Sequence, residues 1–179
     1  MDRAAQTERI IRAVSNPYTT ILGHMTGRQL LRRPGYDIDI EKVLSACAEH
    51  GVAVEINSNP WRLDLDWRWH ESALSLGCLM SINPDAHSTR ELDLTHWGVE
   101  MARKGGVPKD RVLNCHSKDE LASYLEKRAA ERRIKSVPFH RGSAGPRTSA
   151  AAQKSGPHRV RTEKWLSANV SGPPSDGRN

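Results

Sequence analysis

The sequence predicts an α/β protein with a parallel sheet. Helical and strand-like segments alternate along the first 135 residues, and three strand-like segments end in polar residues near His24, Asn57 and Asp85. These ends are 33 and 28 residues apart, which is the length of a βαβ unit with a right-handed crossover. We therefore expect three parallel strands whose carboxyl ends meet at one edge of the sheet, where functional groups gather in this class of protein.

The individual elements follow from apolar spacing and from capping residues. Asp39 is a good N-cap for the helix behind it, and Ser117 with Glu120 forms a capping box. Pro17 and Pro84 end the segments that precede them. The expected helices are 3–15, 39–51, 65–76, 90–104 and 117–133, with a short helical turn at 108–113, and the expected strands are 18–23, 52–57 and 78–82.

The positive charge is concentrated at the C-terminal end of the chain. The formal net charge is +6 over 179 residues, and the pI is about 9.5. Residues 136–179 contain seven Lys or Arg against two acids, together with five prolines, five glycines and seven serines. This composition predicts a disordered basic tail. We therefore expect one folded domain at residues 1–135, close to neutral overall, so the high pI alone does not mark that domain as a nucleic-acid binder.

The cysteines and the N-terminus indicate a cytoplasmic protein. Cys47, Cys78 and Cys115 are widely spaced and fit neither a disulfide framework nor a zinc ribbon. Three such cysteines are typical of a reducing compartment. The N-terminus has no apolar signal segment, and no stretch approaches the length of about 20 apolar residues needed to cross a bilayer.

Polar side chains at the strand ends form a candidate metal site. Asp85 and His87 follow the third strand as an Asp-x-His pair, and His24 follows the first. Carboxylate and imidazole are both ligands for zinc or manganese. The alternatives remain open: Asp-x-His pairs also serve as helix caps, and His24 beside glycines is also typical of an ordinary loop residue. Glu55, in the second strand, is a candidate partner for an arginine such as Arg62.

Arginine and tryptophan residues allow two interpretations each. Arg28, Arg32 and Arg33 follow His24 and are candidates for phosphate binding, although a solvated run of charge fits equally well. Trp61 and the other tryptophans of the folded part are interpreted as packing residues rather than as stacking platforms for bases.

Three motifs, in order, resemble a known family. They are ILGHMTGR at residues 21–28, VEINSNP at 54–60 followed by RLDL at 62–65, and INPDAHS at 82–88. Together they resemble the last part of the polymerase-and-histidinol-phosphatase (PHP) domain, and the likeness is nearest to the version found in bacterial family X DNA polymerases (PolX). The resemblance covers about residues 4–130. It implies the C-terminal three or so βα units of a distorted (β/α)₇ barrel.

The resemblance also assigns roles to individual residues. It implies that His24, Asp85 and His87 are ligands of a divalent metal, zinc or manganese, and that Arg28 and Asn57 are substrate-binding residues. No catalytic residue beyond the metal ligands is expected. The sequence departs from the family pattern at Met25, where proline is usual, and at Pro84, where threonine is common.

The family's activity is metal-dependent hydrolysis of phosphoesters. For the polymerase-associated form the resemblance implies 3′-to-5′ exonuclease activity and the processing of DNA 3′ ends in repair. However, the early H-x-H motif, a middle histidine and a central glutamate of the family have no counterpart in this sequence. Two further readings therefore stay open: a non-catalytic, truncated remnant, and a small-molecule phosphatase of histidinol-phosphatase type. Expected partners are DNA or a phosphate ester, and either a chain that supplies the missing half of the barrel or a second copy.

Overall fold

The computed structural model describes residues 1–135 and contains a small parallel sheet. Its strands are β1 (Ile21–Leu22), β2 (Ala53–Asn57) and β3 (Met80–Asn83), in the order β1-β2-β3. Both strand pairs are parallel, with Leu22 opposite Val54 and Asn57 opposite Asn83. The prediction of a parallel α/β arrangement is confirmed. The complete barrel stays a prediction, and the expected tail at 136–179 lies outside the described residues.

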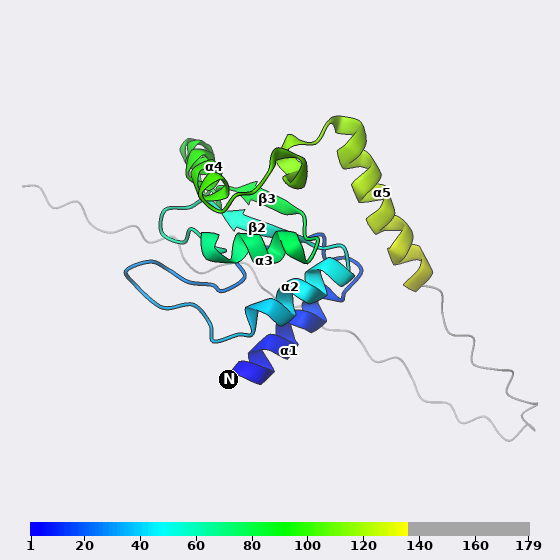
Figure 1. The fold of residues 1–179 in the computed structure, drawn as a ribbon, viewed down its shortest axis with the longest axis horizontal. Coiled ribbons are helices and arrows are strands. Elements are labelled where there is room, and N and C mark those ends of the chain that lie inside the picture. The colour runs from blue at the N-terminus through cyan, green and yellow to red at the C-terminus, as the bar shows by residue number, and fades with distance from the viewer. Residues whose placement is uncertain (136–179) are drawn as a thin grey trace, which may run out of the picture. The chain divides into compact units, whose positions relative to one another are not determined.

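Helices connect and cover the strands (Figure 1). They are α1 (Arg3–Val14), α2 (Ile40–Glu49), α3 (His70–Ser75), α4 (Thr95–Lys104) and α5 (Lys118–Lys135). The expected caps are present: the Asp39 carboxylate accepts a hydrogen bond from the Lys42 amide at 3.1 Å, and Ser117 and Glu120 bond reciprocally. A short 3₁₀ helix at Lys109–Arg111 matches the expected turn. No helix among the described residues is long and apolar enough to cross a bilayer.

The expected helix at 65–76 is wrong in its first part. Leu65 lies alongside β2, where its amide donates to the carbonyl of Glu55 at 3.3 Å, and its side chain is fully buried. A 3₁₀ helix follows at Trp67–Trp69, and α3 begins only at His70. The first strand is also shorter than expected, because only Ile21 and Leu22 pair with β2. Both differences arise from backbone pairing between segments that are distant in sequence.

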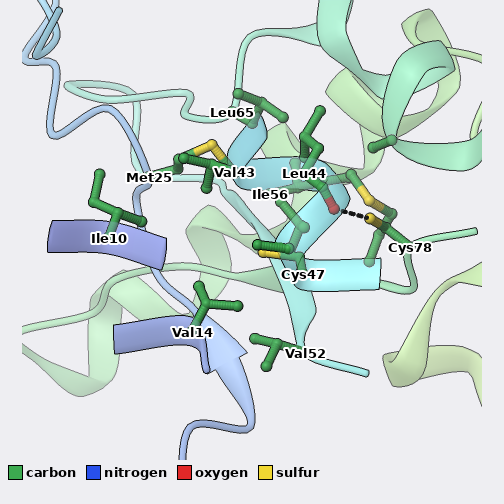
Figure 2. Close-up of a cluster of buried hydrophobic side chains, with 14 of the residues drawn as sticks. Ile10, Val14, Met25, Val43, Leu44, Cys47, Val52, Ile56, Leu65 and Cys78 are labelled. Carbon is green, nitrogen blue, oxygen red and sulfur yellow. Dashed lines mark hydrogen bonds between the residues drawn. The ribbon is translucent and has the colours of Figure 1, made fainter. Parts of the chain in front are cut away.

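The core lies between the sheet and the helices α1, α2 and α3 (Figure 2). Val14 of α1 and Val43, Leu44 and Cys47 of α2 are fully buried, as is Ile56 of β2. Val43 and Leu44 lie four and three residues before Cys47, and this spacing places all three side chains on one face of α2.

The two outer edges of the sheet differ. At β3, Val112 forms a parallel bridge with Met80, and the Asn114 side chain both accepts from the Ile82 amide (2.8 Å) and donates to the Ile82 carbonyl (2.9 Å). At β1, the amide of Ala53 donates to the carbonyl of Thr20, so in this register the amide and carbonyl of Ile21 point away from β2. Among the described residues, no segment pairs with that side of β1.

Helix α5 is tied to the opposite end of the sheet, where β1 and β2 begin. The Tyr124 hydroxyl contacts the carbonyls of Thr20 (3.0 Å) and Gly51 (3.1 Å). The buried guanidinium of Arg128 donates to the carbonyls of Thr19 and His50. These contacts occupy carbonyl groups at the amino ends of the strands and leave the carboxyl ends clear of α5.

The three cysteines should differ sharply in reactivity, because two are buried and one is exposed. Cys47 and Cys78 are buried, and burial raises the pKa of Cys47 to about 12 and that of Cys78 to about 11. The Cys78 thiol also contacts the Leu44 carbonyl at 3.4 Å (Figure 2). Because the thiolate is the reactive species, we expect a disulfide reagent at pH 8 to label the exposed Cys115 rapidly. The other two should react slower by about three orders of magnitude, since opening of the core must precede reaction.

The thiolate that the reagent releases gives the number of cysteines that have reacted, and measuring it before and after unfolding in guanidinium checks this expectation. The Cys115→Ser variant should show no rapid phase. More than one rapid thiol in the native protein, or a rapid phase that survives in Cys115→Ser, would contradict the described core.

Candidate functional site

The structure places the candidate residues of all three strand ends at the carboxyl edge of the sheet. Asn57 is the last residue of β2, His24 lies two residues beyond β1, and Asp85 lies two residues beyond β3. His24 and Asp85 have positive φ angles, 25° and 53°. Non-glycine residues rarely adopt such angles, and where they occur they cluster at functional sites. Leu31 and Leu63, in the loops after β1 and β2, also have positive φ angles, so such backbone marks the loops at this edge rather than the two candidate ligands alone.

A buried carboxylate, Glu55, joins the three strand ends. Its Oε2 accepts from the backbone amide of His24 at 2.6 Å and from Nδ2 of Asn57 at 3.2 Å. Its Oε1 accepts from Nδ2 of Asn83 at 2.9 Å. The Ser81 hydroxyl in turn donates to Oδ1 of Asn83. Glu55 thus links β1, β2 and β3 through its two oxygens, which agrees with its interpretation as a structural residue rather than a metal ligand.

Asp85 is held by Arg62. Nε of Arg62 lies 2.8 Å from Oδ2 of Asp85, and the two side chains are 18% and 22% exposed. An ion pair that is largely shielded from solvent in this way fixes the orientation of the carboxylate. The expectation that Glu55 would be the partner of Arg62 is wrong, because Nε of Arg62 pairs with Asp85 after β3, while Glu55 accepts from three amide donors.

His87 is exposed and has a defined tautomer. Its Nδ1 lies 2.7 Å from the backbone carbonyl of Asp85, and its amide donates to Oε2 of Glu91 at 2.8 Å. A carbonyl only accepts, so Nδ1 carries a proton, and in the neutral ring the lone pair is then on Nε2. Metal-binding histidines commonly have this arrangement, in which the non-ligating nitrogen donates to a carbonyl.

Arg28 is bonded to the protein itself. Its Nε donates to the carbonyl of Arg62 at 2.8 Å, one Nη donates to Asp66 at 2.7 Å, and the other donates to the carbonyl of Leu63. Hydrogen bonds from Arg68 and Arg28 hold the pKa of Asp66 well below its usual range. In this structure the hydrogen bonds of Arg28 therefore connect the loop after β1 to the loop after β2.

Asn57 is also occupied by internal contacts. Its side chain is fully buried, and its Oδ1 accepts from the Asn59 amide at 3.1 Å while Nδ2 donates to Glu55. The expected substrate contacts of Arg28 and Asn57 stay predictions. The contacts that the structure does show for both residues are those that shape the site.

Asp64 is a buried residue that the motifs did not single out. Its Oδ2 accepts from the amides of Thr26 (2.9 Å) and Gly27 (3.0 Å), and burial raises the pKa of its carboxyl group. Asp64 thus pins the turn that follows His24. In the sequence, Asp64 could have been found as the acidic residue of the RLDL motif, two positions after Arg62.

The described residues do not form a complete metal site. Within residues 1–130, no group of three or more His, Cys, Asp or Glu side chains is arranged to hold one ion. His24 and the Asp85–His87 pair share an edge of the sheet without converging on a common point. Taken alone, these residues supply only part of the ligand set that a metal ion needs.

Comparison with known proteins gives relatives of two kinds. No family model matches the chain. It is 37% identical over 120 residues to the DNA polymerase/3′-5′ exonuclease PolX of Bacillus subtilis, which covers 67% of this chain and 21% of the relative. It is 29% identical over 133 residues to a probable phosphatase of Thermoanaerobacter sp. (strain X514), covering 71% of this chain and 51% of the relative. A probable phosphatase of Vibrio parahaemolyticus is 28% identical over 129 residues.

The matched lengths limit what these relatives imply. The chain spans about half the length of the phosphatases and about a fifth of the length of PolX. The similarity to PolX and to probable phosphatases agrees with the resemblance expected from the three motifs.

Proposed function

We propose that this chain contributes the C-terminal part of a PHP-type, metal-dependent phosphoesterase that processes DNA 3′ ends. One observation carries the proposal: the carboxyl edge of the sheet presents His24, Asp85 and His87 in a chain 37% identical to a polymerase/3′-5′ exonuclease over 120 residues. A small-molecule phosphatase is the second candidate, and it is favoured by the relatives named probable phosphatases.

The described residues support this role by presenting and orienting ligands. In the neutral ring, His87 offers the lone pair of Nε2, because Nδ1 donates to the Asp85 carbonyl. Arg62 holds Oδ2 of Asp85 and leaves the other oxygen for a further contact. When bound, zinc or manganese supplies a Lewis acid and an acidified water for attack on phosphorus. Arg28 and Asp64 keep the loops around these residues in place.

A second polypeptide segment must complete the metal site. Because no group of three potential ligands is gathered within residues 1–130, the proposal requires further ligands from outside these residues. The outer side of β1, where Ile21 has no strand neighbour in the described part of the chain, is the proposed place for that segment to pair. Pairing there would bring new side chains next to His24.

Binding and hydrolysis measured on the same variants test this function. We expect weak binding of zinc or manganese by calorimetry, lost in His87→Ala, and manganese-dependent release of nucleotides from a 3′-labelled oligonucleotide, reduced at least about a hundredfold in Asp85→Ala. Hydrolysis is measured with the chain alone and with a supplied PHP N-terminal segment.

His96 offers a matched control for His87. It is exposed, and its Nδ1 contacts the Asp93 carbonyl at 2.6 Å, but it lies on α4 rather than at a strand end. His96→Ala should bind metal like the wild type. Equal metal binding by wild type and His87→Ala would contradict the site. Absence of hydrolysis under both conditions would favour a non-catalytic scaffold, and cleavage of a small ester but not of DNA would favour the second candidate.

A further inference from the structure

An exposed arginine–tryptophan pair lies on the loops that carry the candidate site. The Arg32 guanidinium carbon lies 4.7 Å from the centroid of the Trp61 ring. Trp61 is 55% exposed, and Leu31 beside Arg32 is fully exposed. The interpretation of Trp61 as a packing residue is therefore wrong, because the residue lies at the surface with more than half of its area accessible to solvent.

The backbone holds this pair in place. The Leu30 amide donates to the Trp61 carbonyl at 2.7 Å, which joins the loop after β1 to the loop after β2. Gln29 and Arg33 form an antiparallel bridge that closes the turn carrying Arg32. The Trp61 amide donates to Oδ1 of Asn59 at 3.0 Å. The stack is thus built on two loops that are fixed to each other.

The same loops reach the candidate ligands. Arg62 follows Trp61 directly, and its Nε lies 2.8 Å from Oδ2 of Asp85. Arg28 donates to the carbonyl of Arg62. The Arg32–Trp61 pair therefore belongs to the loops at the carboxyl edge of the sheet, which also carry Arg62, the partner of Asp85.

Arg32 is the arginine of this loop that is available to a ligand. Residues 27–36 contain three arginines and no acid. The side chains of Arg28 and Arg33 donate to acceptors within the protein, whereas within residues 1–130 the Arg32 guanidinium contacts the Trp61 ring and forms neither a hydrogen bond nor an ion pair. A guanidinium stacked on an indole keeps its N–H groups in its own plane, where they match the oxygens of a phosphate.

We propose that the Arg32–Trp61 pair binds single-stranded nucleic acid. Trp61 stacks an unpaired base, which is possible for any base, and Arg32 binds a neighbouring backbone phosphate. This inference rests on the proposed function, because it assigns to the Arg32–Trp61 pair the binding of the DNA strand that the proposed site would process. It concerns binding, so it is tested without hydrolysis.

The experiment compares two oligonucleotides that carry the same charge. The full chain is titrated by fluorescence anisotropy, in EDTA and at fixed salt, with labelled oligo-dT and with an abasic strand of equal length. The basic residues of 136–179 attract both strands through their phosphates. Only oligo-dT has bases that can stack on Trp61, and we therefore expect the wild type to bind oligo-dT about tenfold more tightly than the abasic strand.

Variants locate the preference. Trp61→Ala should bind both strands equally, whereas Trp61→Phe should keep most of the preference because it retains an aromatic face. Arg32→Ala and Arg32→Lys should both weaken binding of oligo-dT, since lysine keeps the charge but not the planar, stackable group. Trp97→Ala is the matched control, because Trp97 is 45% exposed on α4.

Each outcome bears on one proposal. Equal affinity of the wild type for the two strands, or an equal loss in Trp97→Ala and Trp61→Ala, would overturn this inference. A clear preference for oligo-dT without any nuclease activity would overturn the proposed function and leave the platform intact. Release of nucleotides from DNA by a chain without that preference would overturn this inference and leave the proposed function intact.

Discussion

Gly105→Ala should destabilise the fold by about 3 kcal/mol or more. A Cβ at Gly105 would overlap Nδ1 of His70 and lie 2.7 Å and 2.8 Å from its Cγ and Cβ. His70 cannot move aside, because its side chain is fully buried and Nε2 contacts the Leu65 carbonyl at 3.3 Å. Burial also lowers the pKa of His70, so the ring is held in its neutral form. Chemical unfolding followed by circular dichroism measures the loss.

A double-mutant cycle with His70 isolates this overlap. In a His70→Ala background the same change at Gly105 should cost less than about 1 kcal/mol, because the ring that the methyl group meets is gone. Gly23→Ala is a control of the same chemistry, since a Cβ there meets its nearest atom, Oε2 of Glu55, at an ordinary 3.4 Å. If Gly105→Ala cost the same in both backgrounds, His70 would not be the source of the strain.

Local signals in the sequence were sufficient for most of the secondary structure. Asp39 and the Ser117–Glu120 capping box correctly gave the starts of α2 and α5, and Pro84 marked the end of β3. Each of these signals acts within a few residues, so it is readable without knowledge of the fold. Their correct prediction also placed His24, Asn57 and Asp85 at one edge of the sheet.

Contacts between distant residues were not predictable in this way. Leu65 fits the helical spacing of Trp69 and Ala73, yet a backbone hydrogen bond to Glu55 keeps it out of the helix. Charge alone does not decide whether Arg62 pairs with Glu55 or with Asp85, because that choice depends on which loop faces which strand end. In the same way, the exposure of Trp61 depends on how two loops meet.

Glu55→Ala should also destabilise the protein, by about 3 to 5 kcal/mol, because it leaves three donors at the strand ends without their acceptor. Those donors are the His24 amide and the side-chain amides of Asn57 and Asn83. The isosteric Glu55→Gln should cost about 2 kcal/mol, since one carboxylate oxygen is replaced by an NH₂ group that faces other donors. Urea unfolding curves measure both losses.

Glu49→Gln, an exposed change on α2, is the matched control and should leave stability within about 0.5 kcal/mol of the wild type. Repeating the unfolding with zinc or manganese, in the completed assembly, separates a structural carboxylate from a ligand. If Glu55 acts only through its internal hydrogen bonds, the variants keep the stabilisation that metal confers, because His24, Asp85 and His87 still bind the ion. Loss of that stabilisation in Glu55→Gln would place Glu55 among the ligands instead and move the centre of the site from the loops into the sheet.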